Sequence, residues 1–196
     1  ECQEDAVESW AGRGGESDAS SARKIFNLPL SSPHPQMAAC INAVRVNPAR
    51  YQADFNKVSS CRYSTWIAGA TKPKRKALSY TDTAATRLDR AARGHATDMA
   101  TKNFFSHTGS TGASPMQRAR AAGYTGNSLG ENIAAGYTNI RKAMVAWMCS
   151  SGHRSNLMNC RWSSFGSGYA YGSASTYKHY YVQDFGCKAS SCNSCV

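Results

Sequence analysis

The chain has 196 residues, of which 41% are hydrophobic, and a formal net charge of +11. This length fits one domain with tails, and the hydrophobic share is sufficient for a substantial core. No apolar run approaches the roughly 20 residues that a transmembrane helix requires, so we expect no transmembrane segment. Because the chain starts at Glu1, we expect a mature form from which a signal peptide has been removed.

The positive charge lies outside the first 34 residues. Residues 1–34 carry six acids against three bases, whereas the remainder carries 20 bases against six acids. Such a cationic body is attracted to anionic surfaces, for example acidic polysaccharide or lipid headgroups. The densest basic run, Lys72-Pro73-Lys74-Arg75-Lys76, has no interleaved aromatic residues that could stack on bases. We therefore expect an exposed loop there and no nucleic-acid partner.

The cysteines are spread over the whole chain, at Cys2, Cys40, Cys61, Cys149, Cys160, Cys187, Cys192 and Cys195. An even number in this arrangement predicts disulfides and an oxidising compartment. We expect a secreted or extracellular protein, with the cell wall or cell surface as its location. Only the last two cysteines have C-x-x-C spacing, which disfavours a zinc ribbon. Cys149 and Cys160 are close in sequence, and we expect them to pair.

The chain divides into three parts. Residues 1–34 are rich in Ser, Gly and charge and bury too little apolar surface to fold alone. We expect an acidic arm there that attaches to the body or to a protein partner. Ser31-Ser32-Pro33-His34-Pro35 marks the boundary to a domain over 35–187, and a cysteine-containing tail covers 188–196.

Two helices are predicted in the first half of the domain. The first begins after Gln36 and is interrupted or turned at Asn47-Pro48. The second is capped by Asp82 or Thr83 and carries His95 on its apolar face. A lone histidine on such a face is more often a hydrogen-bonded core residue than a ligand, so we assign His95 to the core.

Two further helices are predicted in the second half. Ser114 caps a short helix that stops at Gly123. Residues 124–139 are punctuated by glycines, and we assign them to neither helix nor strand. Another helix runs from Ile140 to about Cys149, after which Gly152 lets the chain leave it.

The end of the domain is predicted to be a β-hairpin. Residues 165–171 and 176–185 are aromatic and β-branched, and residues 172–175 form the turn between them. The many tyrosines are compatible with a face that stacks on sugars. Cross-strand packing in a half-buried sheet explains them more simply.

Two histidines and a carboxylate lie at loop-like positions between these elements: His107, Glu131 and His153. If the fold brings them together, they form a polar cavity. Two neutral imidazoles are good zinc ligands, but catalytic zinc usually takes three protein ligands and a water. The third would be Glu131, another group or solvent. Alternatively, the three side chains form a hydrogen-bonded network that fixes the loops.

Six short motifs, in this order, resemble the CAP superfamily, which includes cysteine-rich secretory proteins, antigen 5 and pathogenesis-related proteins. They are residues 91–100, Phe105-Ser106-His107, residues 130–134, Trp147-Met148, residues 152–157 and residues 181–186. The resemblance covers roughly residues 37–187 and is strongest to the bacterial-like branch. It implies an α+β fold, a three-layer α-β-α sandwich with a small, mostly antiparallel sheet.

The resemblance also implies a site. Family members commonly carry two histidines and two acids in a large central cavity, and the histidines can bind a divalent metal, often zinc. In this sequence the histidines are His107 and His153, and the first acid is Glu131. The second acid falls at Ser150, which departs from the family because a serine supplies no charge. We therefore expect weak zinc binding at most, with Glu131 and Ser150 lining the cavity.

Three functions are compatible with these observations. The first is a secreted, non-enzymatic protein that binds a lipid, a sterol or an anionic glycan at an extracellular surface, and this is the one we favour. The second is a metal-dependent, peptidase-like hydrolase, which no H-E-x-x-H or G-x-S-x-G motif supports. The third is a component of an extracellular assembly, linked to other chains through the arm and the tail. We assign no catalytic residue.

Overall fold

The computed structural model describes residues 33–48 and 75–187. The acidic arm, the basic run up to Lys74 and the tail after Cys187 lie outside the described residues. The helices are α3 (Pro33–Val46), α6 (Thr83–Lys102), α7 (Pro115–Ala121), α8 (Ile140–Cys149) and α9 (Ser151–Leu157), and the strands are β1 (Leu129–Ala135), β2 (Ser164–Tyr171) and β3 (His179–Gly186).

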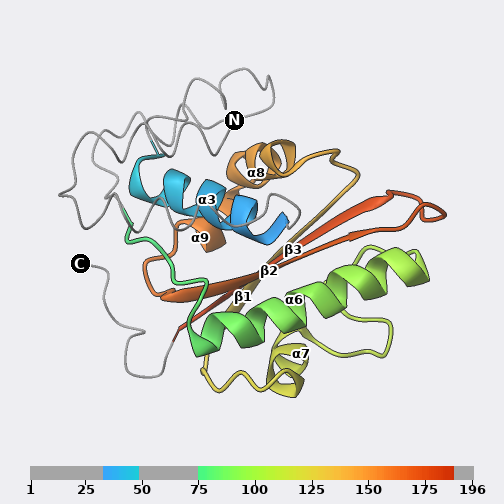
Figure 1. Ribbon diagram of the computed structural model, residues 1–196, viewed down its shortest axis with the longest axis horizontal. Coiled ribbons are helices and arrows are strands. Elements are labelled where there is room, and N and C mark those ends of the chain that lie inside the picture. Colours follow the sequence, from blue (N-terminus) through green and yellow to red (C-terminus); the bar gives the residue numbers. More distant parts are fainter. Residues whose placement is uncertain (1–32, 49–74, 188–196) are drawn as a thin grey trace.

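The three strands form one antiparallel sheet between two layers of helices. The strand order is β1-β3-β2, so β3 is central and is paired on both sides. Helices α3, α8 and α9 lie on one face of the sheet, and α6 and α7 lie on the other (Figure 1). The predicted α+β sandwich with a small antiparallel sheet is confirmed.

Alternation along β3 divides the core between the two layers. Tyr181 and Phe185 join the cluster that contains α3 and α8, whereas Tyr180 and Val182 join the cluster formed with α6. All four side chains are at most 3% exposed. The strand is therefore buried on both faces, although it carries the polar residues Gln183 and Asp184 in its second half.

The helix caps follow the sequence closely. Asp82 accepts a hydrogen bond from the Ala85 amide at 2.7 Å and is the N-cap of α6, as predicted. Ser114 forms a reciprocal capping box with Gln117 at the start of α7. These caps fix where α6 and α7 begin, and therefore where the loop between them runs.

Strand β2 lies so close to α6 that two of its positions require glycine. A Cβ atom on Gly166 would collide with the backbone of Asp89, and one on Gly168 would collide with the backbone of Ala92. The contact is between backbones, so no side-chain movement can relieve it. This close approach brings the middle of α6 directly onto the sheet.

We predict that Gly168→Val lowers the free energy of unfolding by about 3 kcal/mol, because overpacking forces the helix away from the sheet. The matched control is Gly94→Ala, also on α6, where an added Cβ meets nothing within 4 Å. That control should stabilise the protein by about 1 kcal/mol, since alanine is the better helix former. Urea denaturation of both variants measures the two values, and equal effects would contradict the packing argument.

Strand β1 and helix α9 depart from the prediction. Strand β1 lies within residues 124–139, which we assigned to no element, because its consecutive buried polar residues, Glu131 and Asn132, hide the strand pattern. The prediction that the chain leaves its helix at Gly152 was also wrong. The break comes at Ser150, whose backbone is extended, and the helical path resumes as α9, with Gly152 inside it.

The turn between β2 and β3 is longer than predicted, since β3 begins at His179 rather than at Thr176. The Thr176 amide donates to the Asn103 side chain at 2.7 Å, which pulls this segment toward the end of α6 and away from β2. Lys178 then adopts a left-handed backbone, with a φ of 62°, to enter β3.

The described cysteines support the predicted disulfide framework. Cys40, Cys149, Cys160 and Cys187 are all disulfide-bonded, and none of the described cysteines is free. The pairing of Cys149 with Cys160 stays a prediction. Among the described residues, no helix is both long and apolar enough to cross a bilayer.

Candidate functional site

The loop after α6 carries His107, and the buried side chain of His95 forms a hydrogen bond to this loop. His95 is fully buried, and its Nε2 lies 2.9 Å from the carbonyl oxygen of Ser106, the residue before His107. Since a carbonyl can only accept, Nε2 carries the proton. Burial, followed by the charge of Arg118, lowers the pKa of His95 and keeps the ring neutral. The assignment of His95 to the core is confirmed, and its role there is to position the loop.

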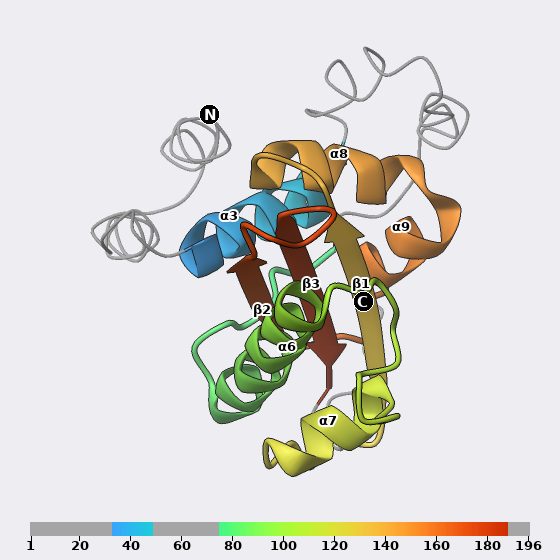
Figure 2. The same ribbon diagram turned by 90° about the vertical axis from the view of Figure 1, so that its right-hand side faces the viewer.

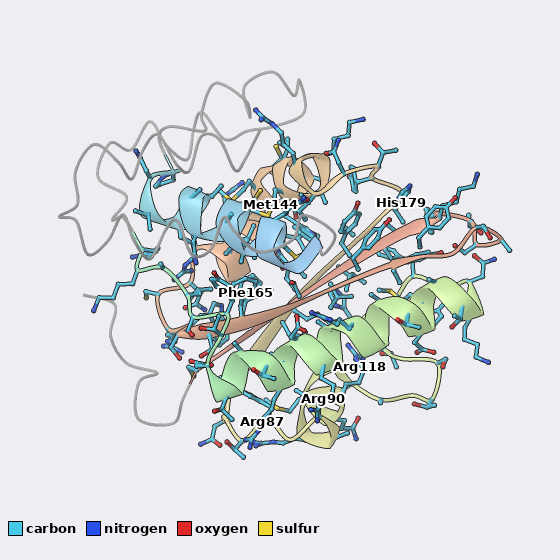
Figure 3. The ribbon with its side chains drawn as sticks, in the orientation of Figure 1. Arg87, Arg90, Arg118, Met144, Phe165 and His179 are labelled. Atoms are coloured by element: carbon cyan, nitrogen blue, oxygen red, sulfur yellow. The ribbon has the colours of Figure 1, made fainter. Side chains whose placement is uncertain are left out.

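Glu131, on β1, is the centre of the site. Its side chain is only 2% exposed, and both carboxylate oxygens are occupied. Oε1 lies 2.8 Å from Nδ1 of His107, and Oε2 accepts from the guanidinium of Arg118, on α7. Arg118 also donates to the carbonyls of His107 and Ala113, at 2.8 and 2.9 Å. One arginine therefore ties the carboxylate to the loop that carries His107, on the α7 side of the sheet (Figure 3).

A second acid, Asp184 on β3, lies directly opposite Glu131 in the antiparallel register. Directly paired residues point to the same face of a sheet, so the two carboxyl groups are neighbours. Asp184 is only 1% exposed. Burial, followed by the charge of Glu131, raises the pKa of Asp184 well above its ordinary value.

Asp184 has no hydrogen-bond partner among the described residues, since no donor reaches either of its buried oxygens. A charged carboxylate in such a place would be costly, so we assign a proton to Asp184. Glu131 differs, because it forms an ion pair with Arg118 and lies within hydrogen-bond distance of His107. We therefore treat Glu131 as the carboxylate of the two.

This assignment fixes the state of the His107 ring. An ionised Glu131 only accepts, so Nδ1 of His107 donates to it. In the neutral ring the lone pair is then on Nε2. The His107 side chain is 52% exposed, so Nε2 is the ring nitrogen left for a ligand.

His153 approaches the same place from α9. Burial, and then the neighbouring charge of His107, lowers the pKa of His153. The loop after α6 runs along the outer side of β1, below α9 (Figure 2). The two histidines that the sequence singled out thus lie on segments that flank the same edge of the sheet, and the charge of His107 acts on the pKa of His153.

Two asparagines lock α9 onto β1. Asn132 donates to the carbonyl of His153 at 3.2 Å and to the side chain of Gln183 at 3.1 Å. Asn156 donates to the carbonyl of Glu131 at 3.1 Å and to the Asn132 side chain at 3.0 Å. Because these amides donate to the backbone carbonyls of His153 and Glu131, they determine where the two residues lie relative to each other.

Ser150 lies where one helix ends and the next begins. It is half-buried at the junction of α8 and α9, where its amide donates to Ala146 and its carbonyl accepts from the Arg154 amide. Its side chain makes no capping hydrogen bond at the start of α9. Its place in a cavity stays a prediction. The second carboxyl beside Glu131 is that of Asp184.

The sequence held one signal for Asp184, which we missed. Gln183 and Asp184 are polar residues in the middle of an otherwise apolar and aromatic strand. Polar residues in a central strand must find partners or lose their charge, because both faces are buried. Asp184 loses its charge, and Gln183 bonds to Asn132 and to the sulfur of Met144.

The residues of the site do not form a multidentate metal cage. Among the described residues, no group of three or more His, Cys, Asp or Glu side chains is arranged to hold a metal ion. Glu131 holds Nδ1 of His107. A carboxylate in this position is the usual outer partner of a metal-binding imidazole and is not itself a ligand.

A family model for CAP, the cysteine-rich secretory protein family, matches residues 39–185. The chain belongs to the CAP family. The match spans every element from α6 to β3 and includes all the site residues described above.

Known relatives agree with this membership. The chain is 38% identical to the uncharacterized protein YkwD of Bacillus subtilis over 82 residues, which is 42% of this chain and 32% of YkwD. It is 33% identical to the uncharacterized membrane protein YlbC of the same organism over 94 residues, or 48% of this chain and 25% of YlbC. The match therefore spans a third or less of the length of either relative.

A solved structure shows the same fold. It is that of an extracellular protein containing a SCP domain from Bacillus anthracis str. Ames, with a TM-score of 0.54 and 24% identity, and the match covers 80% of this chain and 40% of that one. At this identity the similarity establishes the fold alone.

Proposed function

We propose that this chain is a secreted, non-enzymatic CAP protein that binds a lipid, a sterol or an acidic glycan at an extracellular surface. The observation that carries the proposal is the saturation of Glu131. Its two oxygens are engaged by His107 and Arg118, and its side chain is only 2% exposed. A group held in this way builds a rigid site.

The same contacts argue against Glu131 as the general base of a hydrolase. A general base must be within hydrogen-bond reach of the proton that it removes and must be free to accept it. Both oxygens of Glu131 are engaged, by His107 and Arg118, and its side chain is only 2% exposed. Ser150, where the family resemblance would place another acid, cannot ionise at neutral pH. Hydrolysis with Glu131 as its base would require these contacts to be broken first.

The net positive charge of the chain and the oxidising compartment that its disulfides indicate favour an anionic ligand outside the cell. The net charge is +11, which attracts anionic surfaces over distances of about a Debye length, roughly 8 Å in physiological salt. Disulfides at Cys40, Cys149, Cys160 and Cys187 support an oxidising compartment. The Bacillus anthracis protein that shares the fold is described as extracellular.

Direct binding tests the proposal. The protein would be passed over immobilised anionic lipids, sterols and acidic glycans at physiological salt, together with a peptide library that reports hydrolysis. Retention on at least one of the three ligand classes, without peptide cleavage, is expected. Cleavage that disappears in Glu131→Gln, or no retention at all, would overturn it.

A metal would be held by Nε2 of His107 and by His153, and when bound it would polarise an oxygen of a ligand in the site. We predict weak zinc binding at neutral pH that is lost in acid. Both imidazoles have to be neutral to bind the metal, and burial together with the charge of His107 lowers the pKa of His153, so protonation of His153 competes only below the ordinary histidine value of about 6.5. Titration calorimetry at pH values of about 7.5 and 5 measures this.

Three variants distinguish the residues that would bind zinc from Glu131, which only orients one of them. His107→Ala and His153→Ala should each abolish zinc binding, whereas Glu131→Gln should weaken it by about 10-fold to 100-fold, as expected for an outer partner. Equal binding by all four proteins would place the metal elsewhere. The assembly hypothesis depends on residues 1–34 and 188–196, nearly all of which lie outside the described residues.

A further inference from the structure

The exposed apolar side chains of this protein gather at one end. Among the described residues, the large hydrophobic side chains that are exposed are Phe105 (44%), Tyr171 (56%) and Tyr177 (46%). Tyr171 is the last residue of β2, and Tyr177 lies in the turn that leads to β3. This turn lies beside the C-terminal end of α6 (Figure 1), from which the loop with Phe105 departs.

These side chains are held in place. The rings of Phe105 and Tyr177 are 5.8 Å apart, and Tyr177 packs edge-on against the buried ring of Tyr180 at 6.1 Å. On the other side of the hairpin, Tyr171 packs edge-on against His179 at 5.0 Å. The aromatic groups are therefore preorganised, and binding a partner would not have to order them.

Exposed lysines surround the aromatic side chains. Lys102 ends α6 and Lys178 precedes β3, and both are exposed. Lys142, also exposed, reaches the Thr138 hydroxyl in the segment after β1. That segment belongs to the same end, since the Gly136 amide donates to the carbonyl of His179.

Asp98, whose charge interacts with Lys102 at this end, is engaged in hydrogen bonds of its own. Asp98 interacts with the charge of Lys102, but both of its oxygens accept hydrogen bonds from Ser110, at 2.6 and 2.8 Å. The end of the molecule thus presents rigid aromatic rings within a field of positive charge. We call the surface formed by Phe105, Tyr171, Tyr177, Lys102 and Lys178 the hairpin end.

We propose that the hairpin end docks on the interface of an anionic lipid bilayer. Tyrosine rings, apolar with one polar tip, are enriched at the headgroup level, and lysines extend their charge to the headgroups while their stems stay apolar. Neither signal alone anchors a protein firmly, but an apolar insertion combined with basic charge does. This inference rests on the proposed function and names its surface and its ligand class.

A second basic face provides the contrast. Arg87 and Arg90 lie on α6 beside α7 (Figure 3), at the opposite end of the helix from Lys102. None of the exposed large hydrophobic side chains named above belongs to this face. If only charge mattered, the two faces would contribute equally. If the hairpin end docks, its residues dominate.

The test is co-flotation of the full chain with vesicles, either of mixed phosphatidylglycerol and phosphatidylcholine or of phosphatidylcholine alone. The variants are Phe105→Ser/Tyr177→Ser, which removes the rings, Lys102→Gln/Lys178→Gln, which removes two charges, and the charge-matched control Arg87→Gln/Arg90→Gln. We expect binding to the anionic vesicles only, a loss of about tenfold or more in each hairpin-end variant, and a smaller loss in the control. Circular dichroism and thermal unfolding would confirm that each variant is folded.

The outcomes separate this inference from the proposed function. If wild type binds sterols or glycans but no anionic vesicle, the hairpin-end inference fails while the proposed function stands. If wild type binds anionic vesicles but Arg87→Gln/Arg90→Gln loses as much vesicle binding as Lys102→Gln/Lys178→Gln, lipid binding stands. Its location at the hairpin end is then overturned. If the hairpin-end variants lose retention on an acidic polysaccharide and not on vesicles, the surface recognises glycan and the lipid assignment is wrong.

Discussion

Replacing Arg118 with methionine is expected to lower the free energy of unfolding by about 3–5 kcal/mol, because it leaves the buried charge of Glu131 without its cation. Of the two described donors to the Glu131 carboxylate, His107 and Arg118, only Arg118 carries a fixed positive charge. Its side chain is 12% exposed, so water replaces it poorly. It also holds the carbonyls of His107 and Ala113, so the loop that carries His107 should loosen at the same time. Urea denaturation gives the energy, and hydrogen exchange reports the loop.

A neighbouring arginine supplies the control for this variant. Arg120 is also on α7, but it is exposed and bonds only to the carbonyl of Tyr124 among the described residues. Arg120→Met should cost about 1 kcal/mol or less. Adding Glu131→Gln to Arg118→Met should recover part of the loss, since it removes the uncompensated charge. Equal destabilisation by the two arginine variants would contradict the central role of Arg118.

The Asp184→Asn variant is expected to change the pH dependence of stability more than stability itself. In the folded protein, burial and then Glu131 raise the pKa of Asp184, whereas in the unfolded chain it titrates at about 3.9. Between these two values the folded state binds one more proton, so wild-type stability falls as pH rises, by about 1.4 kcal/mol per pH unit. Asparagine cannot ionise, so the part of the slope that comes from Asp184 should vanish.

The control for Asp184 is Asp98, whose pKa is shifted in the opposite direction. Burial alone would raise the pKa of Asp98, but the hydrogen bonds from Ser110 outweigh it and lower that pKa. Asp98 therefore contributes stability that is present above its unfolded value and lost as pH falls. Asp98→Asn should weaken the protein at neutral pH relative to wild type, and Asp184→Asn should not. His95 and His153 titrate in both variants and cancel in the comparison. The same slope in Asp184→Asn as in wild type would show that Asp184 is ionised.

Local chemistry made much of this fold predictable. Asp82 and Ser114 stand where a short polar side chain satisfies the first amides of a helix, and both caps are observed. The aromatic, β-branched run before Gly186 predicted β3, although its start moved to His179. His95 was assigned to the core from its helical face alone, and it is fully buried.

The missed elements share a physical cause. Strand β1 buries Glu131 and Asn132, whose partners come from α7, α9 and β3, so no local pattern marks it as a strand. Asp184 was overlooked because its neighbour across the sheet is fixed by register, and register is set by the whole fold. The sequence could supply His107, Glu131 and His153 as candidates. It could not show that an arginine holds Glu131 fixed beside a buried acid.

The most direct test of this account is a carbon-detected NMR titration of the carboxyl groups of Asp184 and Glu131. Asp184 should keep its proton through the region near pH 3.9 where ordinary aspartates ionise, and its signal should move only at higher pH. An Asp184 signal that titrates near 3.9, like that of an exposed aspartate, would contradict a neutral Asp184 beside Glu131 and, with it, the fixed site on which the non-enzymatic proposal rests.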